Sequence, residues 1–110
     1  ESYRVPADTL DACERARAHG GRVIAIGTTA TRALESAVSF GELQGRTNLF
    51  ITPGYQWKVV DMMMTNFHMP RTTLLLMVES FIGEKWRAIY SEAIEQRYRM
   101  LSFGDAMLLL

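Results

Sequence analysis

The sequence has few of the residues from which several kinds of site are built. Its 110 residues include one cysteine, Cys13, and two histidines, His19 and His68. A single cysteine cannot form a disulfide within the chain, and one Cys with two His cannot supply a structural zinc site. We therefore expect no bound metal, a reducing compartment such as the cytoplasm, and a buried structural role for Cys13.

The chain also lacks an excess of one charge and a long apolar run. Twelve basic residues balance twelve acidic ones, so no overall field favours nucleic acid, although a local basic patch is compatible with this balance. No apolar run reaches the roughly 20 residues of a membrane span, and no signal peptide opens the chain. With 48% hydrophobic and 22% charged residues, the composition predicts one soluble globular domain without a membrane partner.

Short apolar segments alternate with helical patterns and turn signals, which is typical of an α/β fold. The expected elements are, in order, a helix at residues 9–19, a strand at 22–27, a helix at 30–38, a loop at 39–45, a strand at 47–52, a strand at 58–65, a helix at 74–82, a helix at 86–101 and a strand at 106–110. The strand at 22–27 is continuously apolar, which predicts a place inside a parallel sheet.

A first polar cluster follows the strand at 22–27. Ligands of parallel sheets gather at the carboxyl ends of strands, where helix N–H groups point outward. The hydroxyls of Thr28 and Thr29 could hold a carboxylate, a phosphate or a ribose there, or either could simply cap the helix. Both interpretations stay open because the turn has no glycine-rich phosphate motif. Arg32 and Glu35 are three residues apart, which predicts a surface ion pair.

A second group surrounds the Pro-Gly turn at residues 53–54. Tyr55 and Trp57 beside this turn stack on a base or pack over a strand end, and the sequence leaves both possibilities open. Asp61 lies within an apolar run and needs a partner wherever it is buried. Three methionines follow at residues 62–64. They either fill the core or form a surface that contacts the substrate sulfonium or a partner.

The third cluster, residues 65–74, places an amide, an imidazole, a guanidinium and hydroxyls between two apolar runs. Buried polar groups are unfavourable unless they are hydrogen-bonded or used. His68 carries an imidazole, whose ordinary pKa is near neutrality, so it is the leading general acid or base, while a purely structural histidine stays open. Asp105, before the last strand, could bind a ligand or cap local N–H groups.

Four motifs occur in a fixed order along the chain. They are GTT-x-x-R-x-LES at residues 27–36, FI-x-PGY at 50–55, D-x-x-x-TNFH-x-PRTTLL at 61–75 and SFGDAML at 102–108. Together they resemble the motifs of the S-adenosylmethionine:tRNA ribosyltransferase-isomerases of queuosine biosynthesis. Ala30 and Thr31 replace the commoner Ser-Val, and Met69 replaces leucine.

The resemblance implies a fold and a place within it. The family has an α/β barrel-like domain with a smaller β-barrel insertion, and its members are much longer than this chain. Residues 1–110 would then be a single domain, the C-terminal portion of the larger catalytic domain, with short, mostly buried strands alternating with helices. A partial barrel has unpaired strand edges, so we also expect self-association of the fragment.

The resemblance also implies an activity. The family transfers and isomerises the ribosyl part of S-adenosylmethionine onto 7-aminomethyl-7-deazaguanine in tRNA, giving epoxyqueuosine, adenine and methionine. S-adenosylmethionine is a co-substrate, and no cofactor is bound permanently. The implied catalytic residues are His68, Asp105 and Asp61. The implied substrate-binding residues are Thr28, Thr29, Arg32, Asn66, Tyr55, Arg71 and Thr72.

Two other functions compete with this one. A non-catalytic α/β module that binds a nucleotide or a partner chain would have the same composition. An ordinary methyltransferase would use the same co-substrate, but the chain has no glycine-rich loop with an acidic residue about 20 positions later, which disfavours it. Binding of S-adenosylmethionine without ribosyl transfer to precursor tRNA would favour the module or an inactive fragment.

Overall fold

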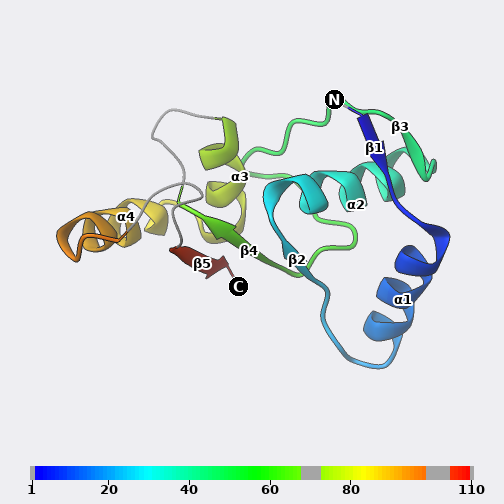
Figure 1. Cartoon of the computed structure of the whole chain (residues 1–110), viewed down its shortest axis with the longest axis horizontal. Coiled ribbons are helices and arrows are strands. Elements are labelled where there is room, and N and C mark those ends of the chain that lie inside the picture. The colour runs from blue at the N-terminus through cyan, green and yellow to red at the C-terminus, as the bar shows by residue number, and fades with distance from the viewer. Residues whose placement is uncertain (1, 68–72, 99–104, 110) are drawn as a thin grey trace.

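The computed structural model describes residues 2–67, 73–98 and 105–109, and shows a mixed α/β fold (Figure 1). In chain order its elements are β1 (Ser2–Arg4), α1 (Ala7–Ala18), β2 (Ile24–Ile26), α2 (Thr28–Phe40), β3 (Gln44–Arg46), β4 (Met62–Asn66), α3 (Thr73–Ile82), α4 (Lys85–Glu95) and β5 (Ala106–Leu109). The predicted α/β class is confirmed at this level.

The main sheet has three strands in the order β2-β4-β5. β2 runs parallel to β4, with Ile26 opposite Met64, and β5 runs antiparallel to β4, with Ala106 opposite Asn66. The C-terminal ends of β2 and β4 and the start of β5 therefore meet at one edge, called the C-terminal edge below. A separate antiparallel pair joins β1 to β3.

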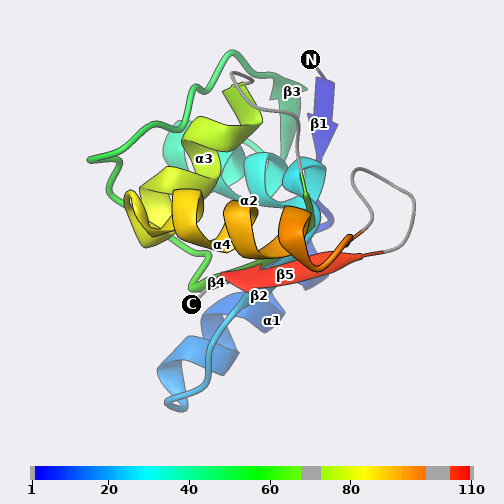
Figure 2. The ribbon, with the colours of Figure 1, turned by 90° about the vertical axis from the view of Figure 1, so that its left-hand side faces the viewer.

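Helices cover one face of the main sheet. Figure 2 shows α2, α3 and α4 on the same side of the strands. Met63 and Leu109 point to this side and are buried with Val78 of α3 and Tyr90 of α4. A second cluster joins Ala25 of β2 to α2, with Cys13 of α1 partly buried against it. Both clusters thus pack against the helix-covered face of the strands that form the C-terminal edge.

The opposite face of the main sheet is open and apolar. Ile26, Met64 and Leu108 lie in one cross-strand row and are 72%, 38% and 44% exposed, and Ile24 is 48% exposed. The sequence predicted that the strand around Ile24–Ile26 is buried on both faces, and this is wrong for the present chain. Side chains alternate between the faces of a strand, so only Ala25 reaches the helix-covered core.

The predicted strand at residues 47–52 is also wrong. The hydroxyl of Thr47 accepts hydrogen bonds from Ser36 Oγ at 2.8 Å and from the backbone N–H of Leu49 at 3.0 Å. A side chain that binds the backbone two residues later favours a turn over a sheet ladder. The third strand in the chain is instead β3, which overlaps the end of the predicted loop and pairs with β1.

Two predicted elements are shorter than expected. The strand predicted at 58–65 begins only at Met62, because a buried carboxylate binds the preceding N–H groups, as described below. The helix predicted at 86–101 ends at Glu95. Arg97 adopts the left-handed conformation, with φ of +61°. Its N–H donates to the carbonyl of Ile94, and Tyr98 N–H donates to that of Ala93, which closes the helix as a Schellman motif.

Candidate functional site

The first predicted cluster lies at the C-terminal edge. Gly27 N–H donates to the carbonyl of Met64 at 2.7 Å, which ties the end of β2 to the end of β4. Gly27, with φ of +96°, is the N-cap of α2 and has no side chain to cap it. Thr28 is therefore the first residue of the helix, and the interpretation of Thr28 or Thr29 as the N-cap is wrong. Their hydroxyls lie beside the first turn of α2, where N–H groups face outward.

Asn66 and Asp105 meet at the same edge. Asn66 Nδ2 donates to the backbone carbonyl of Asp105 at 3.1 Å, and both side chains are half-buried. The antiparallel register of β4 and β5 brings together residues 39 positions apart. Three predicted segments, those of Thr28, Asn66 and Asp105, thus lie at one edge. His68, Arg71 and Thr72, which were predicted with them, lie outside the described residues.

Arg32 follows one turn after Thr28 on α2. Its Nη2 atom donates to the carbonyl of Leu49 at 3.1 Å. It also lines a small pocket of about 60 Å³ with Leu49, Phe50, Ile51, Leu74 and Met77. The guanidinium therefore holds the segment after β3 against α2. Its predicted contact with a substrate carboxylate stays a prediction.

Glu35 is the residue that the sequence misjudged most. It has no exposure to solvent, so a surface ion pair with Arg32 is wrong. Its Oε1 accepts hydrogen bonds from Tyr55 Oη at 2.7 Å and Lys58 N–H at 2.9 Å. Its Oε2 accepts from the N–H groups of Val59 and Val60, both at 2.9 Å. These four donors satisfy both oxygens of the buried carboxylate.

Tyr55 and Trp57 are packed into the same region. The Tyr55 ring meets the Trp57 ring edge-on, with 5.2 Å between the ring centroids. Trp57 stacks on Phe81 of α3, with 4.1 Å between their centroids. Burial, followed by contacts to Glu35 and opposed by one with Ser39, raises the pKa of Tyr55 to about 12. Trp57 Nε1 is buried without a hydrogen-bond partner among the described residues. These contacts favour packing over stacking on a base for Trp57.

Asp61 lies at the other end of β4 from Asn66. Its Oδ2 accepts a hydrogen bond from Val23 N–H at 2.8 Å, and its Oδ1 lies 3.3 Å from Arg17 Nη2. Arg17 therefore supplies the partner that the sequence analysis required. Five residues of strand span roughly 17 Å, so the structure does not bring Asp61 together with Asp105. Asp61 fastens α1 to the start of β2.

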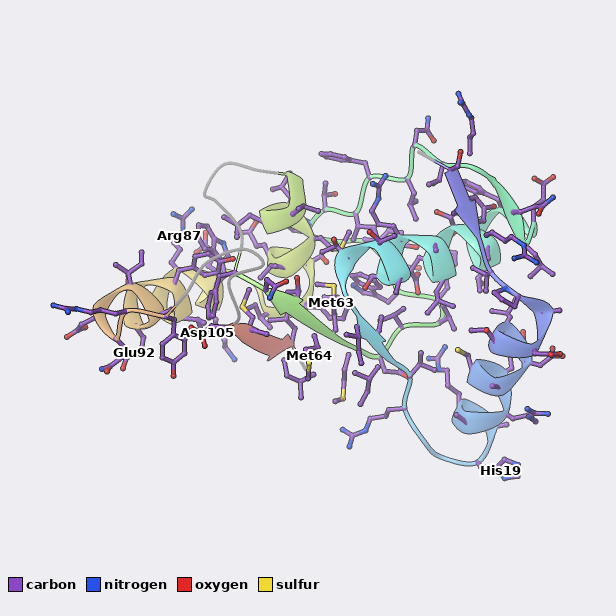
Figure 3. The ribbon with its side chains drawn as sticks, in the orientation of Figure 1. His19, Met63, Met64, Arg87, Glu92 and Asp105 are labelled. Carbon is purple, nitrogen blue, oxygen red and sulfur yellow. The ribbon has the colours of Figure 1, made fainter. Side chains whose placement is uncertain are left out.

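The described parts of the chain were compared with the requirements of a metal site and of a membrane span. Among residues 2–67, 73–98 and 105–109, no group of three or more His, Cys, Asp and Glu side chains could hold a metal ion. Over the same residues, no helix is both long and apolar enough to cross a membrane. Figure 3 shows His19 at the end of α1, on the opposite side of the molecule from Asp105 at the start of β5.

Comparisons with known proteins agree on one family. The family model described as "Queuosine biosynthesis protein" matches residues 1–109. A protein of Polynucleobacter necessarius named S-adenosylmethionine:tRNA ribosyltransferase-isomerase is 56% identical over 99% of this chain. A protein of Acaryochloris marina with the same name is 57% identical over 96% of it. The chain spans 32% and 30% of these two relatives.

A solved structure shows the same arrangement. The crystal structure of S-adenosylmethionine tRNA ribosyltransferase from Thermotoga maritima superposes with a TM-score of 0.92 at 44% sequence identity. The match covers 99% of this chain and 40% of that one. The fold described above is therefore similar to one part of a longer protein.

Proposed function

We propose, since the chain belongs to the queuosine biosynthesis protein family, that it forms one wall of the active site of an S-adenosylmethionine:tRNA ribosyltransferase-isomerase. One observation carries the proposal. Thr28 at the start of α2, Asn66 at the end of β4 and Asp105 before β5 meet at the C-terminal edge. Ligands of α/β sheets bind at this kind of edge.

The proposed reaction moves the ribosyl part of S-adenosylmethionine onto 7-aminomethyl-7-deazaguanine in tRNA. Adenine and methionine leave, and epoxyqueuosine forms. A base must remove a proton next to the sulfonium, and we assign this to His68 or Asp105. A carboxylate near the sulfonium also stabilises its positive charge, which suits Asp105.

The remaining edge residues are proposed to hold the substrate. The hydroxyls of Thr28 and Thr29, with the first N–H groups of α2, would bind the methionine carboxylate or the ribose. Asn66 would orient Asp105 and the substrate together, because its amide already binds the Asp105 carbonyl. Arg32 would add positive charge one turn along α2. No cofactor would be bound permanently.

Asp61 and Tyr55 receive supporting roles in this proposal. The Asp61 carboxylate is engaged by Arg17 and Val23, and the Tyr55 hydroxyl by Glu35. Arg71 and Thr72, together with the exposed Lys58, would contact tRNA phosphates and make binding salt-sensitive. A reaction on tRNA would place the protein in the cytoplasm.

The open sheet face supports the finer fold proposal. We infer that the 110 residues are the C-terminal part of a barrel-like catalytic domain. The exposed row of Ile26, Met64 and Leu108 is apolar enough to pack against further strands or helices. This chain matches 32% of the length of the Polynucleobacter necessarius relative. The rest of that relative is long enough to supply such elements.

A chimera tests the function. The matching third of the Polynucleobacter necessarius relative would be replaced by this chain, and release of adenine from S-adenosylmethionine would be followed with precursor tRNA. At 56% identity, we expect turnover by the chimera. Asn66→Ala should lower kcat/KM at least about tenfold.

Two controls make the chimera decisive. Asn48→Ala changes an exposed asparagine away from the edge and should leave turnover unaltered. His68→Ala should lower kcat, and full turnover in that variant would remove His68 from the catalytic assignment. A chimera that folds and binds tRNA but releases no adenine would contradict the proposed function itself.

A further inference from the structure

A pocket of about 380 Å³ lies beside the end of β4, on the helix-covered side of the sheet. Its lining residues are Phe67, Ala88, Ile89, Glu92, Ala93 and Tyr98. The volume falls within the range of small-molecule sites. No residue assigned above, catalytic or substrate-binding, lines this pocket.

The lining is apolar and aromatic with one carboxylate at its side. Tyr98 and Ile89 are 52% and 38% exposed, which is high for large apolar side chains, and a ligand in the pocket would cover them. The Phe67 and Tyr98 rings meet edge-on at 5.9 Å, so they form a corner. A flat ring can pack into such a corner with its face on one aromatic side chain.

The end of α4 and the Tyr90 ring keep this aromatic corner in place. The Schellman motif at Arg97 turns the chain back, so that Tyr98 lies over Ala93 instead of continuing α4. Tyr90 holds the other side of Phe67 at 5.3 Å. The left-handed conformation of Arg97 is unfavourable for a residue with a side chain. It therefore places Tyr98 at a local conformational cost.

Glu92 supplies polarity at the rim. Gln96 Nε2 donates to its Oε1 at 3.3 Å, and among the described residues Oε2 remains open to a ligand. Figure 3 shows Glu92 on α4. A carboxylate accepts hydrogen bonds from an exocyclic amine and attracts an ammonium group. An apolar corner with one acceptor is suited to a flat ring that carries an amino group.

We propose that this pocket binds a purine-type base of the substrates, an inference that rests on the proposed function. Phe67 directly follows Asn66, so the pocket adjoins the C-terminal edge through the backbone. The shared chemistry is a flat fused heterocycle with an amino substituent. Two sources supply it, the adenine of S-adenosylmethionine and the 7-aminomethyl-7-deazaguanine of tRNA.

Calorimetric titration of the 110-residue chain tests the proposal with two probes, adenosine and free 7-aminomethyl-7-deazaguanine. We expect at least one probe to bind. Ala88→Trp, at an exposed position of α4, should fill the pocket and weaken that binding at least about tenfold. Arg87→Trp adds the same bulk at the neighbouring position, outside the lining, and should leave binding unchanged.

Glu92→Gln separates the two sources. The cationic aminomethyl base should lose at least about tenfold in affinity, whereas adenosine should lose little, because a glutamine oxygen still accepts a hydrogen bond from its amine. Glu95→Gln, on the same helix and outside the pocket, is the matched control. The probe that binds more tightly to the wild-type chain identifies the base.

The outcomes distinguish the pocket from the function. If neither probe binds, or if Ala88→Trp binds both as the wild-type chain does, the pocket assignment is overturned, and the chimera can still turn over. If Ala88→Trp blocks binding but the chimera is inactive, the pocket stands and the proposed reaction fails. Circular dichroism of each variant checks that the helix content of the chain is unchanged.

Discussion

At Glu35, a single carboxylate holds α2 to a segment 20 to 25 positions later in the chain. The N-terminal end of α2 carries Thr28, and the segment leads into β4 with Asn66 at its end. The carboxylate therefore sets the position of one part of the candidate site relative to another. Loss of this carboxylate is costly to stability, because both of its oxygens are buried and each accepts two hydrogen bonds.

We expect Glu35→Gln to lower the free energy of unfolding by about 2–3 kcal/mol, because buried N–H donors lose their acceptor. A glutamine amide keeps one oxygen, but its NH₂ group would face backbone N–H donors instead of accepting from them. Urea titration followed by circular dichroism measures the change. Glu95→Gln, on the exposed face of α4, should stay within about 0.5 kcal/mol of the original chain. Equal midpoints for the two variants would show that Glu35 is not a structural anchor.

Tyr55 makes the stability depend on pH in the alkaline range. Its pKa is about 12 in the folded chain and 10.0 in its ordinary state. The unfolded chain therefore loses this proton first, and the stabilisation is fully present below pH 10 and is lost as the pH rises toward 12. Urea midpoints measured across this window should fall less steeply in Tyr55→Phe. The exposed Tyr98→Phe is the control, and an unchanged slope in Tyr55→Phe would contradict the prediction.

Among the elements, α4 ends for a reason that substitution can test. Arg97 occupies the left-handed position of the Schellman motif, which glycine usually fills. Arg97→Gly should raise the free energy of unfolding by about 0.5–1 kcal/mol, because glycine adopts positive φ without a steric penalty. Ser91→Gly, in the middle of α4, should instead lower it by about 0.5 kcal/mol. Thermal melts of the two variants should shift in opposite directions.

The sequence predicted the elements whose backbone groups bond to one another. The apolar run before Gly27, the helical spacing after it and the strand at the end of the chain all appear as β2, α2 and β5. The failures share a cause, because in each a side chain or an unusual φ replaced the regular backbone pattern. Thr47 bends the expected strand, Glu35 delays β4, and Arg97 ends α4 early. Local propensity contains no signal for partners that lie many positions apart.

The candidate site was predictable to a similar extent. Parallel-sheet logic placed the Thr28 segment at a strand end, and the motif order joined it to Asn66 and Asp105. Periodicity alone could not show that Asp61 lies at the opposite end of β4, since that depends on where the strand begins. Glu35 stayed hidden because three of its four donors are backbone N–H groups of residues 58–60, in a segment that the sequence predicts as a strand. An acidic residue in the mainly apolar part of the helix, between Leu34 and Ala37, was the one available signal.

At the scale of the molecule, the open face of the main sheet is the feature left unsatisfied. Ile24, Ile26, Met64 and Leu108 form one apolar surface, and β2 and β5 are the outer strands of the sheet. Exposed apolar faces beside strand edges favour association with further chain. When the 110 residues are isolated, the only polypeptide that can cover this face is a second copy of the same chain. We therefore expect concentration-dependent dimers by sedimentation equilibrium.

Charge on this face should separate the copies. The double variant Ile26→Lys and Met64→Lys places two ammonium groups in the central row, where burial against a second copy would strip their water. It should sediment as a monomer with an unchanged circular dichroism spectrum, because both side chains already face solvent. Ile94→Lys, 65% exposed on α4 and away from the sheet, should still dimerise. A monomeric original chain would mean that its apolar row stays solvated, and dimers in the double variant would place the contact on another surface.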